Sequence, residues 1–438
     1  MNAIGLDLGT SGLKAVLLSA DGRLLAEATA PLGVQRPHPL WSEQQPADWL
    51  AAADTAVRSL RARVDASDWA AVTTLAVAGQ MHGAVLLDAA GQVLRPAILW
   101  NDGRSQAQCA ELERREPATR RISANRAMAG FTAPKLMWVA EHEPDCFAKV
   151  ATVLLPASWL SFQLSGERAI DCSDAAGTLW LDVAQRRWSA EMLAATSLTE
   201  AQMPRVCEGS EAIGTLRPHW AAAWGLSPRV LLAAGAGDQA GGAVGVGVVR
   251  AGQGFVSLGT SGVLFVASAQ HSANPDRGVH SFCHALPNTW HQMAVMLSAA
   301  DSLSWWSRMT GAAPADLVAP LTVGEVRERA PLFLPYLSGE RTPHADPAAA
   351  GCFLNLRQSQ ERDDLSYAVI EGVAFSFADG LQAMQAGDSR TNEGAAELLA
   401  IGGGARSDAW LQLLADTLQT TLARPAGAEV GPALGAAR

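Results

Sequence analysis

The stretch IGLDLGTSGLKAVLLSADG at 4–22 decides the fold, and FVSLGTSGVLFVAS at 255–268 repeats its central feature. Each copy predicts an apolar strand, a tight turn and a second apolar strand. The first turn consists of Gly9, Thr10, Ser11 and Gly12. Its exposed backbone N–H groups and two hydroxyls are typical of a site for phosphate oxygens, although a plain β-hairpin is the alternative for one copy. Two such copies favour two related halves of one chain that face a nucleotide between them.

Asp7 stands at the end of the first predicted strand, directly before this turn. A carboxylate repels a phosphate, so a second negative group at this place indicates a cation between the two. Mg²⁺, which binds oxygen ligands and keeps several water molecules, fits that position. The sequence therefore predicts a magnesium ion beside Asp7.

The composition is typical of a globular enzyme with more than one domain. The chain has 438 residues, of which 49% are hydrophobic and 17% charged. Domains usually contain about 100–200 residues, so two or more are expected. The net charge of −10 argues against a nucleic acid or an acidic membrane surface as partner. Six scattered cysteines without metal-binding spacing are typical of reduced thiols in the cytoplasm.

The start MNAIGLDLG lacks the basic and apolar regions of a signal peptide, so we expect a cytoplasmic protein. Residues 230–249 are apolar over the length of a membrane span. Asp238 and Gln239 lie at the centre of this stretch and several glycines interrupt it, so we expect no membrane segment. From about residue 228 the chain repeats the N-terminal pattern of an apolar stretch and an LGTSG hairpin. This repeat predicts two domains, 1–228 and 229–438.

Asp238 lies in Gly-Ala-Gly-Asp-Gln, between two runs of small residues. One hypothesis makes it the N-cap of the helix that follows. The other makes it a general base, which accepts the proton of a hydroxyl as that hydroxyl attacks a phosphoryl group. The two hypotheses are compatible, and we retain both.

Gln80, Met81 and His82 follow a predicted buried strand at 72–79. Open α/β sheets bind ligands at the carboxyl ends of their strands, so a ligand contact is expected there. A structural histidine is the alternative. Asp102 is expected to cap a helix that begins near Gly103.

The glycines 402–404 lie between a predicted strand and an amphipathic helix, within 398–416. Three glycines in a strand–helix turn let a flat or phosphorylated ligand approach the backbone closely. Further helices are expected after Pro46 and at 134–142, 293–306 and 361–386.

These motifs together resemble the FGGY family of carbohydrate kinases over essentially the whole chain. The matching segments are DLGTSG (7–12), RPHPLWSEQ (36–44), AGQMHGA (78–84), PAILWNDGR (96–104), SDAAGTLWLDV (173–183), GVHSFCHALP (278–287), FLPYLSGERTPH (333–344) and IGGGARS (401–407). The glycine-rich segments mark the wider superfamily of sugar kinases, Hsp70 and actin. Segments 36–44, 80–83 and 278–287 resemble the members that act on xylulose.

The resemblance implies an α/β protein with two RNase H-like domains of the actin/Hsp70 ATPase type and an active-site cleft between them. It further implies a kinase that transfers a phosphoryl group from ATP, with Mg²⁺, to O5 of D-xylulose. The N-terminal domain would bind the sugar and the C-terminal domain the nucleotide. Family members continue beyond the final GPALGAAR with a helical tail, so a missing C-terminal tail is expected.

The resemblance also assigns roles to single residues. Asp238 corresponds to the catalytic base and Asp7 to the metal-associated carboxylate. The implied sugar contacts are Gln80, Met81, His82, Asp238 and Gln239, the last at a position where many members have Asn. The implied nucleotide contacts are Gly9, Thr10, Ser11, Lys14, Gly259, Thr260, Ser261, Gly402, Gly403 and Ser407.

Two alternatives to this function stay open. One is a kinase of the same family for another pentulose, a pentitol or glycerol. The other is a nucleotide switch like Hsp70 or actin, which binds protein and has no small substrate. Such switches carry an acid in the second hairpin, where this chain has Ser257. The assembly state is also open, with a homodimer as one alternative.

Overall fold

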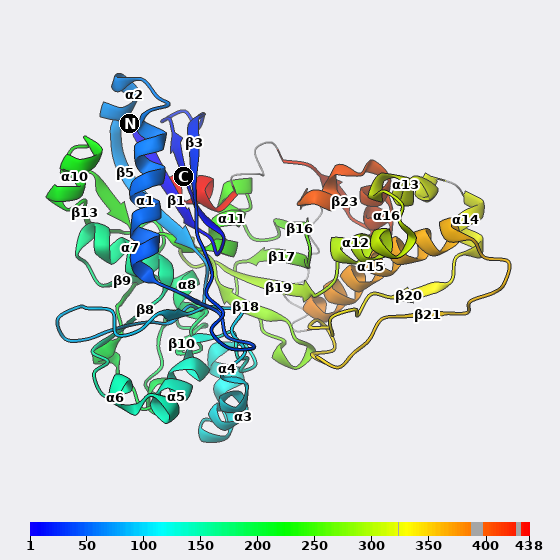
Figure 1. The fold of residues 1–438 in the computed structure, drawn as a ribbon, viewed down its shortest axis with the longest axis horizontal. Helices are drawn as coiled ribbons and strands as arrows, with labels where there is room; N and C mark the ends of the chain where they lie inside the picture. Colours follow the sequence, from blue (N-terminus) through cyan, green and yellow to red (C-terminus); the bar gives the residue numbers. More distant parts are fainter. Residues whose placement is uncertain (323, 387–396, 426–430) are drawn as a thin grey trace. The chain divides into compact units, whose positions relative to one another are not determined.

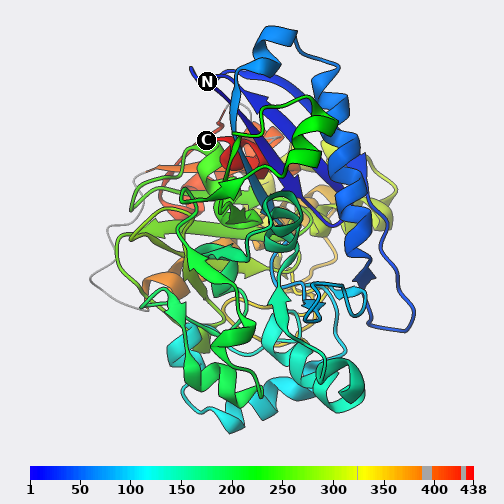
Figure 2. The same cartoon turned by 90° about the vertical axis from the view of Figure 1, so that its left-hand side faces the viewer.

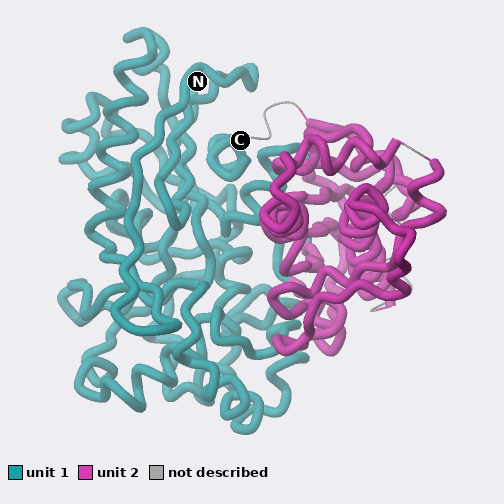
Figure 3. The backbone as a smooth tube through the Cα atoms, turned by 45° about the vertical axis from the view of Figure 1, so that its right-hand side comes forward, with its two compact units in different colours: residues 1–247, 282–289, 430–438 teal, residues 248–281, 290–429 magenta. Residues whose placement is uncertain are grey.

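The computed structural model describes residues 1–322, 324–386, 397–425 and 431–438 (Figure 1). It divides into two compact units (Figure 3), of which unit 1 comprises Met1–Gly247, Phe282–Thr289 and Val430–Arg438. Unit 2 comprises Val248–Ser281 and Trp290–Glu429. The first boundary follows Gly247, later in the chain than the predicted 228, because strands after residue 228 pair within the first sheet.

The sheet of unit 1 begins with the predicted hairpin. β1 (Asn2–Leu8) pairs antiparallel with β2 (Gly12–Leu18), which pairs antiparallel with β3 (Leu24–Pro31). On its other edge β1 pairs parallel with β5 (Val72–Gly79), the strand predicted at 72–79. The remaining strands of the sheet are β13 (Ala212–Thr215), β14 (Leu231–Ala233) and β15 (Ala236–Gly237), of which β14 and β15 pair parallel with β5.

Alternate residues of β2 face two layers of helices, one on each side of the sheet. Leu13, Ala15 and Leu17 belong to the core that includes the buried side chains of α1 (Pro46–Arg61). Val16 and Leu18 pack instead with buried residues of α17 (Gly431–Ala437). Figure 2 shows α1 in blue alongside the blue strands of this sheet. The two-residue period of a strand therefore explains why both faces of this sheet are covered.

The apolar stretch 230–249 forms β14, β15 and α11 (Asp238–Val246), as expected for a buried segment. In the part of the chain that the structure describes, no helix is long and apolar enough to cross a membrane. The glycines of α11 allow α17 to approach closely, and Figure 1 shows the two helices together. A Cβ on Gly435 would lie 1.8 Å from the carbonyl oxygen of Gly241.

We expect Gly435→Ala to lower the free energy of unfolding by about 1–3 kcal/mol or more, because the methyl group would overlap the backbone of α11. Gly33→Ala is the matched control, since a Cβ at Gly33 would meet nothing within 4 Å. Urea unfolding of both variants measures the difference. Equal stability of the two variants would contradict the close approach of the helices.

The sheet of unit 2 repeats the arrangement of the first sheet. β16 (Gly254–Leu258) and β17 (Gly262–Ser268) form the second hairpin, and β19 (Trp290–Met296) pairs antiparallel with β17. β22 (Glu397–Ile401) lies parallel to β16, and β23 (Thr421–Ala423) lies parallel to β22. The order β19-β17-β16-β22 therefore corresponds to β3-β2-β1-β5. The two LGTSG copies lie at equivalent turns of two related sheets.

The other elements complete the two units. Those before residue 248 are β4 (Glu43–Gln44), α2 (Ala66–Ala70), β6 (Val85–Leu87), β7 (Ala97–Ile98), α3 (Gln106–Arg115), α4 (Thr119–Ser123), α5 (Thr132–His142), α6 (Pro144–Phe147), β8 (Thr152–Leu154), α7 (Pro156–Ser165), β9 (Ala169–Asp171), α8 (Cys172–Ala176), β10 (Leu181–Asp182), β11 (Arg187–Trp188), α9 (Ala190–Ala195), β12 (Arg205–Cys207) and α10 (Pro218–Trp224). Those after it are β18 (His280–Cys283), α12 (Ala300–Thr310), α13 (Pro314–Val318), α14 (Gly324–Arg329), β20 (Leu332–Leu334), β21 (Cys352–Leu354), α15 (Arg362–Gln385) and α16 (Asp408–Leu418).

Two local predictions are wrong. The helix predicted at 293–306 is the end of β19 followed by α12, because Val295 lies opposite Val263 in the sheet and extends the ladder. Asp102 does not cap α3, whose N-cap is Ser105. Its carboxylate instead accepts a hydrogen bond from the backbone N of Ser42 and pairs with Arg104.

Candidate active site

Three neighbouring strand ends of unit 1 bring predicted site residues together. β1 pairs with one edge of β5, placing Asp7 opposite Ala78. β15 pairs with β5 as well and places Gly237 opposite Gly79. Asp238 follows Gly237 as the first residue of α11. Asp7 and Asp238 therefore lie on either side of the carboxyl end of β5, the edge where α/β sheets bind ligands.

Burial raises the pKa of both carboxyl groups. The pKa of Asp238 is raised to about 7, mainly by burial and secondly by the negative charge of Asp7. Hydrogen bonds from Gln239 lower this pKa by less. Burial raises the pKa of Asp7 to about 6, although the positive charge of Lys14, its cross-strand neighbour, lowers it. A carboxylate with a pKa near neutrality suits proton transfer at physiological pH.

The structure decides against the capping hypothesis for Asp238. The N-cap of α11 is Gly237, and Asp238 occupies the first helical position. One carboxylate oxygen, Oδ1, accepts a hydrogen bond of 2.7 Å from the backbone N of Gln239. The helix therefore orients this carboxylate from its own first turn, where a negative charge is also favoured by the helix dipole.

Met81 and His82 lie next to the backbone that carries Asp238. A Cβ placed on Gly177 would lie 2.9 Å from Cε of Met81, and one placed on Gly237 would lie 2.9 Å from its Cγ. The Met81 side chain therefore passes between these two glycines. Nδ1 of His82 lies 2.6 Å from the carbonyl oxygen of Gly177. The structure thus brings Met81, His82 and Asp238 together.

Gln80 contacts the turn at residues 9–12 instead. Its Oε1 accepts a hydrogen bond of 2.9 Å from the hydroxyl of Thr10, and its Nε2 donates to Oε1 of Gln44 at 3.0 Å. Its side chain is buried, with 2% of the residue exposed. In this geometry Gln80 supports the turn, and its contact with sugar stays a prediction.

Two further residues that sequence reasoning missed hold the same turn. Nε2 of Gln44 donates to the carbonyl oxygen of Thr10 at 2.8 Å. Nε1 of Trp100 donates to the Thr10 hydroxyl at 2.9 Å. Both residues belong to motifs quoted above, 36–44 and 96–104, but nothing local to those motifs indicates a contact with Thr10.

A second pair of acids, also missed, lies close to Asp238. The Ser173 hydroxyl donates to Oδ2 of Asp171 at 2.5 Å and accepts from the backbone N of Gly237 at 3.0 Å. Burial, followed by the charges of Asp171 and Asp238, raises the pKa of Asp174 well above its ordinary value. The Asp171–Ser173 pair therefore fixes the residue directly before Asp238.

In unit 2, the predicted nucleotide contacts lie at two adjacent strand ends. β16 and β22 are parallel, with Ser257 opposite Ile401, so the turn Gly259–Ser261 lies beside the glycine turn that follows Ile401. The φ of Gly402 is +89°, and a Cβ there would lie 2.8 Å from the carbonyl of Leu258. A Cβ on Gly403 would meet nothing within 4 Å. The second turn therefore leaves its backbone open at Gly403.

Gly259, Thr260 and Ser407 each have a structural partner within unit 2. The carbonyl oxygens of Gly259 and Thr260 accept hydrogen bonds from the backbone N of Ala300 and Ala299, which fixes the hairpin turn against the start of α12. The hydroxyl of Ser407 caps α16 by accepting from the backbone N of Trp410 at 3.2 Å. A nucleotide contact of Ser407 stays a prediction.

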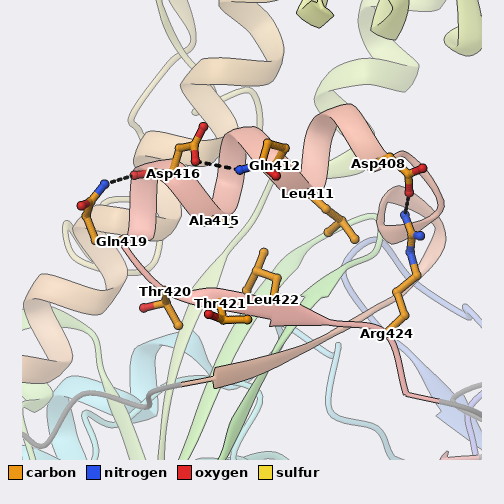
Figure 4. A pocket seen from close by; sticks show the side chains of 10 residues that line it. All are labelled: Asp408, Leu411, Gln412, Ala415, Asp416, Gln419, Thr420, Thr421, Leu422 and Arg424. Atoms are coloured by element: carbon orange, nitrogen blue, oxygen red, sulfur yellow. Dashed lines mark hydrogen bonds and ion pairs between the residues drawn. The ribbon is translucent and has the colours of Figure 1, made fainter.

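A surface pocket of about 780 Å³ lies between α16 and β23 (Figure 4). The pocket is lined by Asp408, Leu411, Gln412, Ala415, Asp416, Gln419, Thr420, Thr421, Leu422 and Arg424. Nη2 of Arg424 binds Oδ1 of Asp408 at 2.6 Å, and its Nε donates to the carbonyl oxygen of Ala405. None of the residues predicted to bind sugar or nucleotide lines this pocket.

The residues of unit 1 fit a divalent cation whose remaining ligands would come from phosphate and water. Over the described residues, no group of three or more His, Cys, Asp or Glu side chains could hold a metal ion by itself. The raised pKa of Asp7 indicates that its negative charge is incompletely balanced by Lys14. One or two carboxylates together with substrate phosphates are the usual protein ligands of Mg²⁺.

Two related α/β sheets, each with a glycine-rich hairpin turn, place the protein in the actin- and Hsp70-like ATPase class. Residues 2–245 match the N-terminal domain, and residues 254–438 the C-terminal domain, of the FGGY family of carbohydrate kinases. The chain therefore belongs to this family, as its motifs indicate. Members transfer a phosphoryl group from ATP, generally with a divalent metal.

Individual relatives are similar over nearly the whole chain. Xylulose kinase of Escherichia coli (strain K12) is 51% identical over 437 residues, which cover 99% of this chain and 88% of the relative. Xylulose kinase of Bacillus subtilis (strain 168) is 36% identical, covering 99% of this chain and 86% of the relative. The crystal structure of a "xyloylose kinase" from Brucella ovis has a TM-score of 0.95 at 49% identity, covering 100% of this chain and 89% of that one.

Proposed function

We propose that this protein transfers the γ-phosphoryl group of ATP to O5 of D-xylulose, using Mg²⁺ as the divalent metal. The observation that carries the proposal is the position of Asp238 at the carboxyl end of β5, across that strand from Asp7 and next to the Met81 side chain that follows the strand. The high identity to proteins named xylulose kinases supports D-xylulose as the sugar.

The proposed chemical step needs a base near the sugar hydroxyl. Asp238 accepts the proton of the O5 hydroxyl as O5 forms its bond to the γ-phosphorus, and the bond from that phosphorus to the β,γ-bridging oxygen of ATP breaks. Met81, His82 and Gln239 bind the sugar so that O5 faces Asp238. When bound, Mg²⁺ neutralises charge on the phosphate oxygens. The product leaves a protonated Asp238, which returns its proton to water.

The proposed phosphate contacts in unit 1 are the turn residues Gly9, Thr10 and Ser11, together with Lys14. The hydrogen bonds that Thr10 accepts from Gln44 and Trp100 and donates to Gln80 support this assignment, because they fix the turn before any ligand binds. We propose that Gly259, Thr260, Ser261, Gly402, Gly403 and Ser407 of unit 2 hold the nucleotide. A cytoplasmic location and a homodimer stay predictions from the sequence.

The pKa of Asp238 leads to an expected pH dependence. Only the deprotonated carboxylate accepts a proton, and its pKa in the folded protein is about 7. We therefore expect kcat/KM for D-xylulose to fall about tenfold per pH unit below pH ~7, because kcat/KM reports the ionisation of the free enzyme. A profile that stays flat between pH 5 and pH 8 would contradict the assignment of the base.

A coupled ADP-release assay over ketopentoses, pentitols and glycerol tests the substrate. The proposal expects the highest kcat/KM with D-xylulose. A higher value with a pentitol, glycerol or another pentulose would establish a different specificity within the family. Release of ADP that no sugar stimulates would favour a nucleotide switch.

A further inference from the structure

Lys135 is a fully buried cation that the proposed mechanism does not use. It lies in the second turn of α5, and 0% of the residue is exposed. No carboxylate forms an ion pair with it among the residues that the structure describes. Burial lowers the pKa of Lys135 to about 7. The negative charge of Asp102 raises this pKa, and the positive charge of Arg104 lowers it further. A buried lysine without an ion pair needs another set of acceptors.

Two backbone carbonyl groups supply those acceptors. Nζ of Lys135 donates to the carbonyl oxygen of His82 at 2.8 Å and to that of Gly130 at 2.8 Å. The hydroxyl of Thr132 donates to the same His82 oxygen at 3.1 Å. Both the ammonium and the neutral amine of a lysine have at least two N–H donors, so deprotonation preserves these contacts.

The carbonyl group that α5 holds in this way belongs to a strained turn. The backbone N of Gly83 donates to the carbonyl oxygen of Met81 at 2.9 Å, which closes a three-residue γ-turn around His82. The φ of His82 is +69°. A γ-turn with positive φ at its central residue is rare and strained, and a residue other than glycine persists there only when its surroundings enforce it.

The opposite side of the turn is fixed as well. Nδ1 of His82 lies 2.6 Å from the carbonyl oxygen of Gly177. The centre of the imidazole ring lies 4.6 Å from the ring centre of Phe131. The turn is therefore held at its backbone by α5 and at its ring by Gly177. We expect loss of the backbone contact to let the turn relax and so to displace Met81 and His82 from the positions that these contacts give them.

We propose that Lys135, together with Thr132, is a positioning residue for sugar binding that holds the strained turn presenting Met81 and His82 to the sugar. This inference rests on the proposed function, in which those two residues contact the substrate. Lys135 acts through the His82 carbonyl and touches no substrate itself.

The test compares the KM for D-xylulose with the KM for ATP in the full-length protein. Lys135→Met keeps the length of the side chain but removes its donors. We expect the KM for D-xylulose to rise roughly 10- to 100-fold, the range for loss of a charge-assisted hydrogen bond, while the KM for ATP stays within about twofold. Thr132→Val should raise the KM for D-xylulose by roughly 2- to 10-fold. In a His82→Ala background, Lys135→Met should raise the KM for D-xylulose by a smaller factor, because only the contact of Met81 is then left to position.

The outcomes separate the inference from the proposed function. If His82→Ala raises the KM for D-xylulose but Lys135→Met and Thr132→Val leave it unchanged, the positioning role is wrong and the sugar site stands. If His82→Ala itself has no effect, the sugar site is wrong and the inference fails with it. A fall in melting temperature with an unchanged KM means a purely structural lysine. Should Lys135→Met not fold, Thr132→Val decides the question by the same criterion.

Discussion

The Asp238→Asn variant is expected to phosphorylate D-xylulose about 10²–10⁴-fold more slowly than the wild type, the range for loss of a general base. The amide is nearly isosteric with the carboxylate, but it does not accept the proton of the sugar hydroxyl. The measurement is kcat at saturating ATP and D-xylulose. Asp48→Asn is a matched control, because Asp48 is an exposed acid in the first turn of α1, as Asp238 is an acid in the first turn of α11.

Stability provides an internal check on this variant. The pKa of Asp238 is raised from its ordinary value of 3.8 to about 7 in the folded protein, so the folded state binds this proton more tightly than the unfolded state. The contribution of Asp238 to stability is therefore full below pH ~4 and is lost as the pH rises to ~7. Asparagine has no such loss.

We accordingly expect the melting temperature of Asp238→Asn at pH 8 to equal or exceed that of the wild type. Slow turnover together with a lower melting temperature would point to damaged structure instead of a missing base. Turnover above about a tenth of the wild-type value, in a folded variant, would remove Asp238 from the proton transfer.

The Asp7→Ala variant is expected to need more Mg²⁺ for half-maximal rate and to turn over roughly 10- to 100-fold more slowly, as for loss of a group that supports a metal. The KM for D-xylulose should change little, because Asp7 directly precedes the turn at residues 9–12, the proposed phosphate site, and does not adjoin the Met81–His82 pair in the chain. The measurement is a magnesium titration of the initial rate at constant ATP. Asp21→Ala, in the exposed turn between β2 and β3, is the control.

The same variant makes a second, independent prediction. The negative charge of Asp7 contributes to the raised pKa of Asp238. Its removal should lower that pKa and shift the acidic side of the pH profile of kcat/KM to lower pH. An unaltered magnesium dependence would exclude Asp7 from the metal site, and an unshifted profile would contradict the electrostatic coupling of the two carboxylates.

Local sequence patterns predicted the parts of the fold that depend on local chemistry. The two LGTSG turns indicated two related sheets, and the sheet orders of the two units bear this out. The helix at 361–386 is observed as α15, and the strand at 72–79 as β5. The helix expected at 293–306 failed because cross-strand pairing of β19, a contact between distant residues, outweighs the local pattern.

Local sequence patterns indicated some residues of the candidate site and missed others. Asp7 and the segment 80–82 were singled out because they end or follow predicted strands, and Asp238 because it lies between two runs of small residues. The pairing of β1 and β15 with β5 brings these positions to one edge of the sheet. Lys135, Gln44 and Trp100 were missed because each acts on a residue far away in the chain: Lys135 lies 53 residues from its acceptor His82. Such contacts depend on how the helices pack, which no short motif records.

The most direct test of the account is a ³¹P NMR measurement on wild type and Asp238→Asn, each incubated with ATP, Mg²⁺ and D-xylulose. The account predicts that the wild type forms ADP and one phosphomonoester whose phosphorus couples to the protons on C5 of the sugar. It predicts no detectable ester with Asp238→Asn over the same time. Ester formation by the folded variant at the wild-type rate, or formation of ADP and inorganic phosphate without any ester by the wild type, would contradict it.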